Sequence, residues 1–236
     1  MLHFPELEQF GVIAAMSDKT DGDCSREAPA EAGRSSFLAQ LGIGEDKLIL
    51  PKQIHGNCVH VAWPSWPKEE QRWTPGSVGE ADALAAAAPG WALGVTVADC
   101  VPVLLVSLEP RAIAVVHAGR EGTRQHITSN ALATLVERFG AVPAGINAVI
   151  GPSAGPCCYE VSVALADSFA AGGFPVRGRF LDLWAANQLE LVRAGVPAEQ
   201  VHVSGHCTIC SGRFHSFRTD KTGARNLALI SLRVGS

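Results

Sequence analysis

The sequence predicts a mixed α/β fold of the α+β kind, a layered sandwich whose central mixed β-sheet is flanked by helices. Three neighbouring apolar runs rich in β-branched residues are typical of strands buried on both faces: WALGVTVADC, VPVLLVSL and AIAVVHAG. We expect these three strands to lie side by side in the middle of the sheet. Helical and strand-like segments alternate along the chain that follows. Apolar residues make up 47% of the 236 residues and charged residues 18%, which is enough material for the core of one domain spanning residues 1–236.

The segments before these strands carry weaker signals. The first 35 residues are expected to be atypical and loop-rich, because the polar stretch after GVIAAM has no period. Ser35 or Ser36 is expected to cap a short helix through FLAQLG. Two β-prone runs, LIL and NCVHVAW, flank the turn-like PKQIHG, which places His55 in a turn or at a strand edge. The segment from Pro64 to Gly79 is expected to be a surface loop with aromatic anchors.

The segments after the core strands predict further helices and strands. Apolar residues recur at steps of three and four from Ile127 to Phe139, as in an amphipathic helix, and Gly140 provides the stop. INAVIG and VHVSG are strand-like, GPSAGPCC is turn-like, and VSVALADSFA and LDLWAANQLELVRAGV are helical. A Rossmann or P-loop nucleotide site has no support, because neither GxGxxG nor GxxxxGK[ST] occurs.

The charge balance disfavours polyanionic partners. The net charge is −4, so the sequence does not predict a basic surface for binding duplex nucleic acid or an anionic membrane. The most apolar run, from Trp91 to Val106, is too short to span a membrane and contains Asp99 and Pro102. The acidic N-terminus is unlike a secretory signal, which predicts a cytoplasmic protein. We expect a small-molecule partner, and a monomer or homodimer.

Three side chains at the ends of predicted strands are the first candidates for chemistry. Cys100 lies at a break between two core strands, His117 ends AIAVVH, and His55 lies in the QIHG turn. Strand ends open onto the surface while the strand bodies hold side chains rigidly. On the residue pattern alone, a buried structural cysteine and histidines that stabilise turns are the more frequent outcome.

The seven cysteines include two close pairs. Cys207 and Cys210 in HCTIC have the spacing of half a zinc site, but the sequence offers no second pair at the usual spacing. Cys157 and Cys158 are adjacent, which is not the spacing expected for one tetrahedral ion. A redox role is the other alternative, although C-x-x-C is not at the start of an early helix here. The favoured interpretation is structural thiols.

Basic and aromatic residues alternate near the C-terminus in GRFHSFRTDKTGAR. The basic residues are Arg213, Arg218, Lys221 and Arg225. A solvated charged loop and an anion pocket explain this pattern equally well. In an anion pocket the guanidinium groups would bind phosphate oxygens, and Phe214 or Phe217 would stack on a base.

Seven segments carry a family resemblance by their order and spacing. They are KQIHGNCV, GEADALA, TVADCVPVLL, VVHAGREGT, VIGPSAGPCCYEV, FLDLWAANQLELVRAGV and FHSFRTDKTGAR, and they cover most of the chain from Lys52 onward. Together they resemble the laccase-domain family, also called the multicopper polyphenol oxidase family, whose members are described as purine nucleoside phosphorylases. The family fold is a mixed α/β sandwich.

The resemblance implies a metal site. The histidine of the family's QxHG segment, the cysteine of its ADC segment and the histidine of its HAG segment correspond to His55, Cys100 and His117. Two histidines and one thiolate leave the fourth position of zinc open, as in catalytic sites, and copper is the alternative metal. The implied activity is phosphorolysis of adenosine, inosine, guanosine and methylthioadenosine, together with deamination of adenosine by a metal-activated water.

The implied reactions also need a proton carrier and an anion site. Asp82 or Asp99 is expected to transfer the proton. Asp82 is preferred, because Asp99 lies before a strand break, where an aspartate often serves only to form a turn. Arg218 and Arg225 are expected to bind phosphate, and Phe217 to contact the purine.

Two departures from the family pattern bear on activity. The family reads HAGWRG where this chain has HAGREG, so Arg120 and Glu121 replace an aromatic and a basic residue beside His117. The family's early Thr-Arg-x-Gly-Gly turn and Ser-Leu-Asn-Leu run are missing. Both departures predict altered substrate contacts, or loss of activity if the missing groups bind substrate.

Four alternatives remain open. Copper-dependent oxidation of phenols is disfavoured, because about four coppers would need many more histidines than the eight present. A hydrolase with Cys100 as nucleophile, activated by His117, would be inactivated by alkylation and not by a chelator. The chain could also bind metal or nucleoside without turnover, or edit peptidoglycan precursors.

Overall fold

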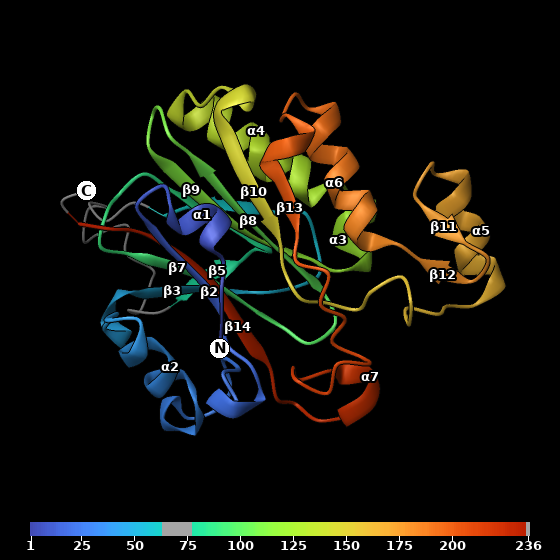
Figure 1. Ribbon diagram of the computed structural model, residues 1–236, viewed down its shortest axis with the longest axis horizontal. Coiled ribbons are helices and arrows are strands. Elements are labelled where there is room, and N and C mark those ends of the chain that lie inside the picture. The colour runs from blue at the N-terminus through green and yellow to red at the C-terminus, as the bar shows by residue number, and fades with distance from the viewer. Residues whose placement is uncertain (63–76, 235–236) are drawn as a thin grey trace.

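Two mixed β-sheets form the centre of the structure, a computed structural model that describes residues 1–62 and 77–234 (Figure 1). Within these residues the first sheet has the order β13-β10-β8-β9-β6-β4, with bounds β13 Val201–Val203, β10 Ile146–Ile150, β8 Val101–Ser107, β9 Ala112–Ala118, β6 Ala83–Ala86 and β4 Val59–Val61. The second has the order β1-β2-β14-β7-β3-β5, with bounds β1 Leu2–His3, β2 Val12–Met16, β14 Asn226–Leu232, β7 Ala92–Val97, β3 Leu48–Lys52 and β5 Ser77–Glu80. A separate ribbon pairs β11 Val176–Arg177 with β12 Phe180–Leu181.

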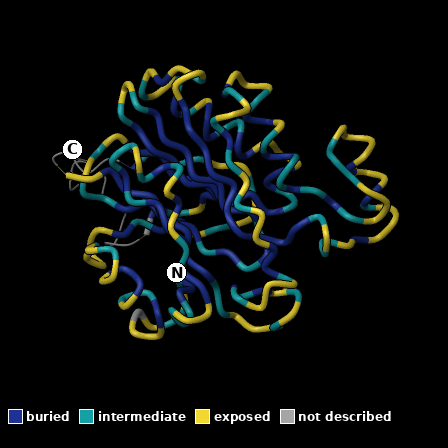
Figure 2. The backbone as a smooth tube through the Cα atoms, viewed as in Figure 1, coloured by how far each residue is buried: buried dark blue, intermediate teal, exposed yellow. Residues whose placement is uncertain are grey.

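The two sheets pack face to face, and their strands are buried along most of their length (Figure 2). In β8, Val103 and Leu105 join the core beneath the helices, whereas Leu104 and Val106 join the core between the sheets. Successive side chains of a strand point to opposite faces, so β8 needs apolar residues at every position. This two-sided burial is why the core strands are continuous apolar runs in the sequence.

Helices cover the outer face of each sheet, which gives four layers (Figure 1). α4 (Ile127–Phe139) and α6 (Leu183–Arg193) pack on the first sheet, and α2 (Arg34–Gln40) packs on the second. The shorter helices are α1 Pro5–Glu8, α3 Arg120–Arg124, α5 Val163–Ala171 and α7 Phe217–Asp220, and the 3₁₀ turns are Lys19–Asp21, Ala30–Ala32, Glu45–Lys47, Pro143–Gly145 and Ala198–Gln200. None of the described helices has the length and apolar character that a membrane span requires.

The mixed α/β class predicted from the sequence is confirmed, but the sandwich contains two sheets where one was expected. β8 and β9 pair along their whole length, as adjacent core strands should. The expectation that the third core strand lies beside them is wrong, because β7 pairs with β14 and β3 in the other sheet. The chain therefore crosses from one sheet to the other between Val97 and Val101.

The expectation of a loop-rich N-terminus is wrong for residues 1–16, which form β1, α1 and β2. β2 is held by β14, with Ala14 opposite Ile230, so its partner lies near the far end of the chain. Residues 17–33 do form a loop, with two 3₁₀ turns and one isolated bridge between Asp23 and Gly33. The predicted surface loop from Pro64 to Gly79 lies mostly outside the described residues, and β5 begins at Ser77.

A buried aspartate ties this N-terminal loop to the C-terminal part of the chain. Asp18 is 3% exposed, and its carboxylate accepts hydrogen bonds from the Thr20 amide and hydroxyl and from Arg213 Nε. Burial alone would raise the pKa of Asp18, but the hydrogen bonds from Thr20 and Arg213 hold it well below its usual range. The ionised carboxylate therefore stabilises the folded state above the unfolded-state pKa, near 3.9, and this contribution is lost as the pH falls toward the folded-state pKa.

We expect the Asp18→Asn variant to lose about 2 kcal/mol of the free energy of unfolding at pH 7, because a buried charged acceptor is replaced by a weaker one. The difference from the wild-type protein should shrink as the pH falls below about 4. Urea unfolding of both proteins between pH 7 and pH 3 measures this. A difference that stays constant over that range would show that the Asp18 charge does not contribute.

Candidate metal centre and substrate cleft

The three candidate ligands from separate parts of the chain lie together. His55 is in the loop between β3 and β4, Cys100 is in the crossing from β7 to β8, and His117 is in β9. Their ligand atoms all lie within 4.8 Å of one another. His117 is buried, Cys100 is half-buried and His55 is exposed, so the group opens toward solvent on the His55 side.

The strand register explains how Cys100 and His117 meet. Val101 lies opposite Ala118 and Pro102 opposite His117, so Cys100 is one residue beyond the paired end of β8. Asp99 has a φ of 83°, a left-handed conformation that turns the chain out of β7. Non-glycine residues rarely adopt this conformation, and they do so mostly where the surrounding contacts enforce it.

Gly119 leaves room between the three ligands. A Cβ atom at this position would lie 3.1 Å from Cys100 Sγ, 3.2 Å from His55 Cδ2 and 3.7 Å from His117 Cε1. Because the first two distances are tighter than ordinary van der Waals contact, a side chain here would push the ligands apart. The absence of a side chain at Gly119 therefore allows the three ligands to pack closely.

Asp82, which directly precedes β6, organises two of the ligands. Its fully buried carboxylate accepts hydrogen bonds from the backbone amides of Ile54, His55 and Gly56, at 3.2, 3.0 and 2.7 Å. His117 Nδ1 donates to the same carboxylate at 2.7 Å. Because Nδ1 is committed to Asp82, the Nε2 atom of His117 is left to bind a metal ion. The amide contacts also hold His55 at a φ of 59°.

Electrostatics favour an anionic sulfur at this site. Burial alone would raise the pKa of Cys100, but the neighbouring His117 and His55 outweigh it and lower this pKa to about 6. Burial would lower the pKa of His117, but the Cys100 sulfur and the Asp82 carboxylate raise it to about 9. The pKa of Asp82 is below its usual range, because hydrogen bonds from His117 and the loop amides outweigh burial. The thiolate is the form of cysteine that binds metals and acts as a nucleophile.

The donor set fits a metal ion. Two imidazole nitrogens and one thiolate can fill three positions of a tetrahedral zinc ion and leave the fourth for water or substrate. The hydrogen bond from His117 to Asp82 is the carboxylate–histidine support typical of zinc sites.

The ligands lie in a cleft of about 580 Å³, within the range of small-molecule sites. The predicted substrate residues Phe217, Arg218 and Arg225 line the same cleft. Phe217 is 54% exposed, and the guanidinium of Arg225 lies 5.9 Å from the centre of its ring. The Arg218 guanidinium donates to the Glu160 carbonyl oxygen at 2.7 Å. Of the two interpretations of this basic segment, the cleft favours the anion pocket.

Other predicted residues are engaged in contacts within the protein. Both carboxylate oxygens of Asp99 accept hydrogen bonds, one from the Thr208 hydroxyl and one from the Arg218 amide, each at 2.7 Å. Arg213 binds Asp18. Glu121 pairs with Arg124 at 2.8 Å and with Arg120 at 3.4 Å, so the two residues that replace the family pattern pair with each other at the start of α3.

Sequence reasoning missed several cleft residues. Tyr159 lines the cleft, and the Arg218 guanidinium lies 4.9 Å from the centre of its ring. Its only signal was its place directly after the cysteine pair in GPCCYEV. Arg26 and Glu27 also line the cleft, although they belong to the segment that departs from the family pattern.

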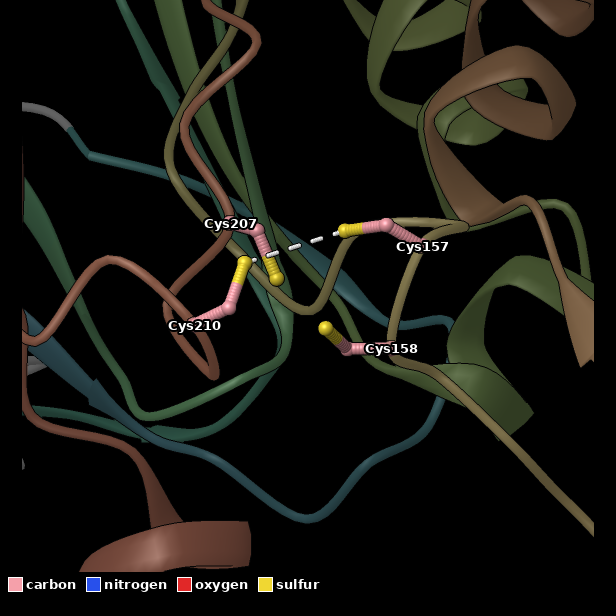
Figure 3. Close-up of side chains that lie close together, drawn as sticks. All are labelled: Cys157, Cys158, Cys207 and Cys210. Atoms are coloured by element: carbon pink, nitrogen blue, oxygen red, sulfur yellow. Dashed lines mark hydrogen bonds between the residues drawn. The ribbon is translucent and has the colours of Figure 1, made fainter.

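The sequence offers no second cysteine pair at the usual spacing, but the fold brings the adjacent Cys157 and Cys158 to Cys207 and Cys210. The Sγ atoms of Cys157, Cys158, Cys207 and Cys210 all lie within 4.8 Å of one another (Figure 3). The chain thus contains two groups of metal-ligating side chains among its described residues.

Comparison with known proteins identifies the family. The model of a protein family described as multi-copper polyphenol oxidoreductase laccase matches residues 18–233. The chain belongs to this family. The resemblance predicted from the sequence is thereby confirmed.

Curated relatives in this family are named for reactions of purine nucleosides. The chain is 34% identical over 211 residues to adenosine deaminase RL5 from an unknown prokaryotic organism, covering 85% of this chain and 78% of that protein. It is 35% identical over 213 residues to a purine nucleoside phosphorylase of Deinococcus radiodurans, covering 86% and 78%.

Solved structures share the fold. The crystal structure of YlmD from Geobacillus stearothermophilus matches with a TM-score of 0.85 at 27% identity, covering 98% of this chain and 94% of that one. The Bacillus licheniformis protein YfiH matches with a TM-score of 0.86 at 26% identity, covering 99% and 96%. The overall fold is therefore shared with these two solved structures.

Proposed function

We propose that this protein is a metal-dependent enzyme that cleaves purine nucleosides with phosphate and deaminates adenosine at the same site. The observation that carries the proposal is that two imidazoles and one low-pKa thiol open into a cleft that two arginines and an exposed phenylalanine also line. The names of the curated relatives support both reactions.

His55, Cys100 and His117 would hold the metal ion, with zinc favoured by the mixed nitrogen and sulfur ligands. When bound, the ion supplies a Lewis acid that polarises a substrate oxygen or activates water at neutral pH. Asp82 holds the proton on Nδ1 of His117 and fixes the direction of its ring. The proton-transfer role predicted for Asp82 competes with this positioning role, because four hydrogen bonds already occupy its carboxylate.

The remaining cleft residues bind the two substrates. Phe217 offers an exposed ring on which a purine base can stack. Arg218 and Arg225 attract the phosphate dianion and orient its oxygen toward C1′ of the ribose. In phosphorolysis a phosphate oxygen forms the new bond to C1′, the bond from C1′ to the base nitrogen breaks, and the base leaves with a proton.

The test is the fate of adenosine with the zinc-loaded protein. We expect adenine when phosphate is present and inosine whether or not phosphate is present, both measured by liquid chromatography. The Arg225→Ala variant should slow adenine formation more than inosine formation, because only phosphorolysis needs the anion. A protein that contains stoichiometric zinc but forms neither product would refute the proposal and leave a non-catalytic binder.

A second candidate, a metal-free thiol hydrolase, is favoured by one observation. Cys100, His117 and Asp82 have the order of nucleophile, base and orienting carboxylate, and the pKa of Cys100 is lowered to about 6. A chelator distinguishes the two candidates. Activity that is lost on chelation and restored by zinc supports the metal enzyme, whereas activity that survives chelation but not alkylation of Cys100 supports the hydrolase.

A further inference from the structure

We propose that Cys157, Cys158, Cys207 and Cys210 bind a second metal ion, zinc, in a structural site that fastens two loops beside the cleft. This site shares no ligand with the His55, Cys100 and His117 group. Its four ligands are all sulfur, and a tetrahedral set of four thiolates is typical of structural zinc.

The fold brings the two cysteine pairs together through parallel strands. β10 and β13 pair in parallel, with Ala148 opposite Val201 and Ile150 opposite Val203. Because parallel neighbours end at the same edge of a sheet, the segments that follow them start side by side. Cys157 and Cys158 lie on the segment after β10, and Cys207 and Cys210 on the segment after β13. The separation of the pairs in the sequence is therefore no obstacle to a shared ion.

The sulfur positions suit one ion. In Figure 3 the four side chains point toward a common centre, two from each segment. Cys157 Sγ and Cys210 Sγ are 3.9 Å apart, and no pair of the four exceeds 4.8 Å. A tetrahedral zinc ion with Zn–S bonds of about 2.3 Å holds its sulfurs about 3.8 Å apart. Only a small inward movement of the sulfurs is needed to reach that spacing.

The surroundings leave the four sulfurs available to a metal ion. All four cysteines are free, so no ligand is consumed by a disulfide. The Gly155 amide donates to Cys207 Sγ at 3.3 Å, a hydrogen bond that stabilises negative charge on the sulfur. As each sulfur binds the ion, a protonated thiol releases its proton to solvent, so four thiolates and Zn²⁺ give the site a charge of −2.

The ion would fix one wall of the cleft. Between the two segments, the Ser153 amide donates to the His206 carbonyl and the Thr208 amide donates to the Ser153 carbonyl, at 3.2 and 2.9 Å. Tyr159, next to Cys158, lines the cleft, and Thr208, next to Cys207, bonds to Asp99. Asp99 directly precedes Cys100. Four metal–sulfur bonds would therefore reinforce the contact between the two segments. One segment reaches the cleft through Tyr159, and the other through the bond of Thr208 to Asp99.

Metal analysis after loading with zinc under reducing conditions tests the proposal. We expect about two zinc ions per chain in the wild-type protein, as two separate ligand sets require. The Cys157→Ser/Cys210→Ser double variant should retain about one, and His55→Ala should lose the other ion. Cys58→Ser is the matched control, because Cys58 is an exposed free cysteine outside both groups, and it should keep both ions.

X-ray absorption at the zinc edge gives a measurement that does not depend on folding of the double variant. His55→Ala leaves the four-cysteine site as the main zinc site, so its zinc should have a shell of four sulfurs at about 2.3 Å. The proposal would be overturned by a zinc content that is the same in the wild-type protein and the double variant. It would equally be overturned by a sulfur-poor shell in His55→Ala, or by a disulfide between Cys157 and Cys210 that persists under these reducing conditions.

Discussion

The His55→Ala variant is expected to lose the metal ion of the His55, Cys100 and His117 group, and with it both reactions of adenosine. Two remaining ligands cannot complete a tetrahedral catalytic site. Removing an outer partner of a metal ligand already costs about 10- to 100-fold in affinity, so removing a ligand should cost more. Elemental analysis and chromatography of the adenosine products measure the two losses.

The place of His55 makes this variant informative. His55 is exposed, so the free energy of unfolding should change by less than about 1 kcal/mol. Its φ of 59° adds backbone strain when alanine replaces it, and His55→Gly is the control because glycine adopts this conformation freely. Cys100→Ala should lose the ion in the same way. If these folded variants keep both the metal content and the activity of the wild-type protein, the assignment of this site is wrong.

Local patterns identified the three candidate ligands because each lies where the sequence shows a break in a strand, the end of a strand or a turn. Cys100 falls at a break in an apolar run, His117 at the end of one, and His55 between two turn-forming residues. The resemblance to the laccase family then selected the same three. The fold class followed from the same apolar runs, since burial on both faces of a strand leaves a continuous apolar segment.

The features that sequence reasoning missed depend on partners far away in the chain. β2 is a strand because β14 pairs with it, and nothing near residues 12–16 indicates that partner. The crossing of the chain between the sheets before Cys100 depends on which strands flank β7. The cysteine pairs meet because β10 and β13 are parallel neighbours. Spacing rules did not indicate this grouping, because they compare cysteines close together in the sequence, whereas Cys157 and Cys210 are 53 positions apart.

The Asp82→Asn variant is expected to lower the metal affinity of the His55, Cys100 and His117 group by about 10- to 100-fold and the free energy of unfolding by about 3 kcal/mol. The asparagine amide has one acceptor oxygen, so its NH₂ group would face either the His117 ring and the His55 amide or the amides of residues 54 and 56. Either outcome leaves a buried donor without an acceptor. Zinc titration against a competing chelator and urea unfolding measure the two effects. Glu80→Gln is the control, because Glu80 is exposed and pairs with Lys52 at the surface.

The same variant separates the two roles considered for Asp82. If Asp82 positions His117, saturating zinc should restore much of the turnover of Asp82→Asn, because the defect is in metal binding. If Asp82 instead transfers the proton, kcat should stay low at saturating zinc and the acidic limb of the pH profile should change, while metal affinity remains near that of the wild-type protein. We expect the first result, because the carboxylate is fully buried and accepts hydrogen bonds from three amides and from the His117 ring. A carboxylate held in this way can orient a metal ligand but has no free oxygen to offer a substrate.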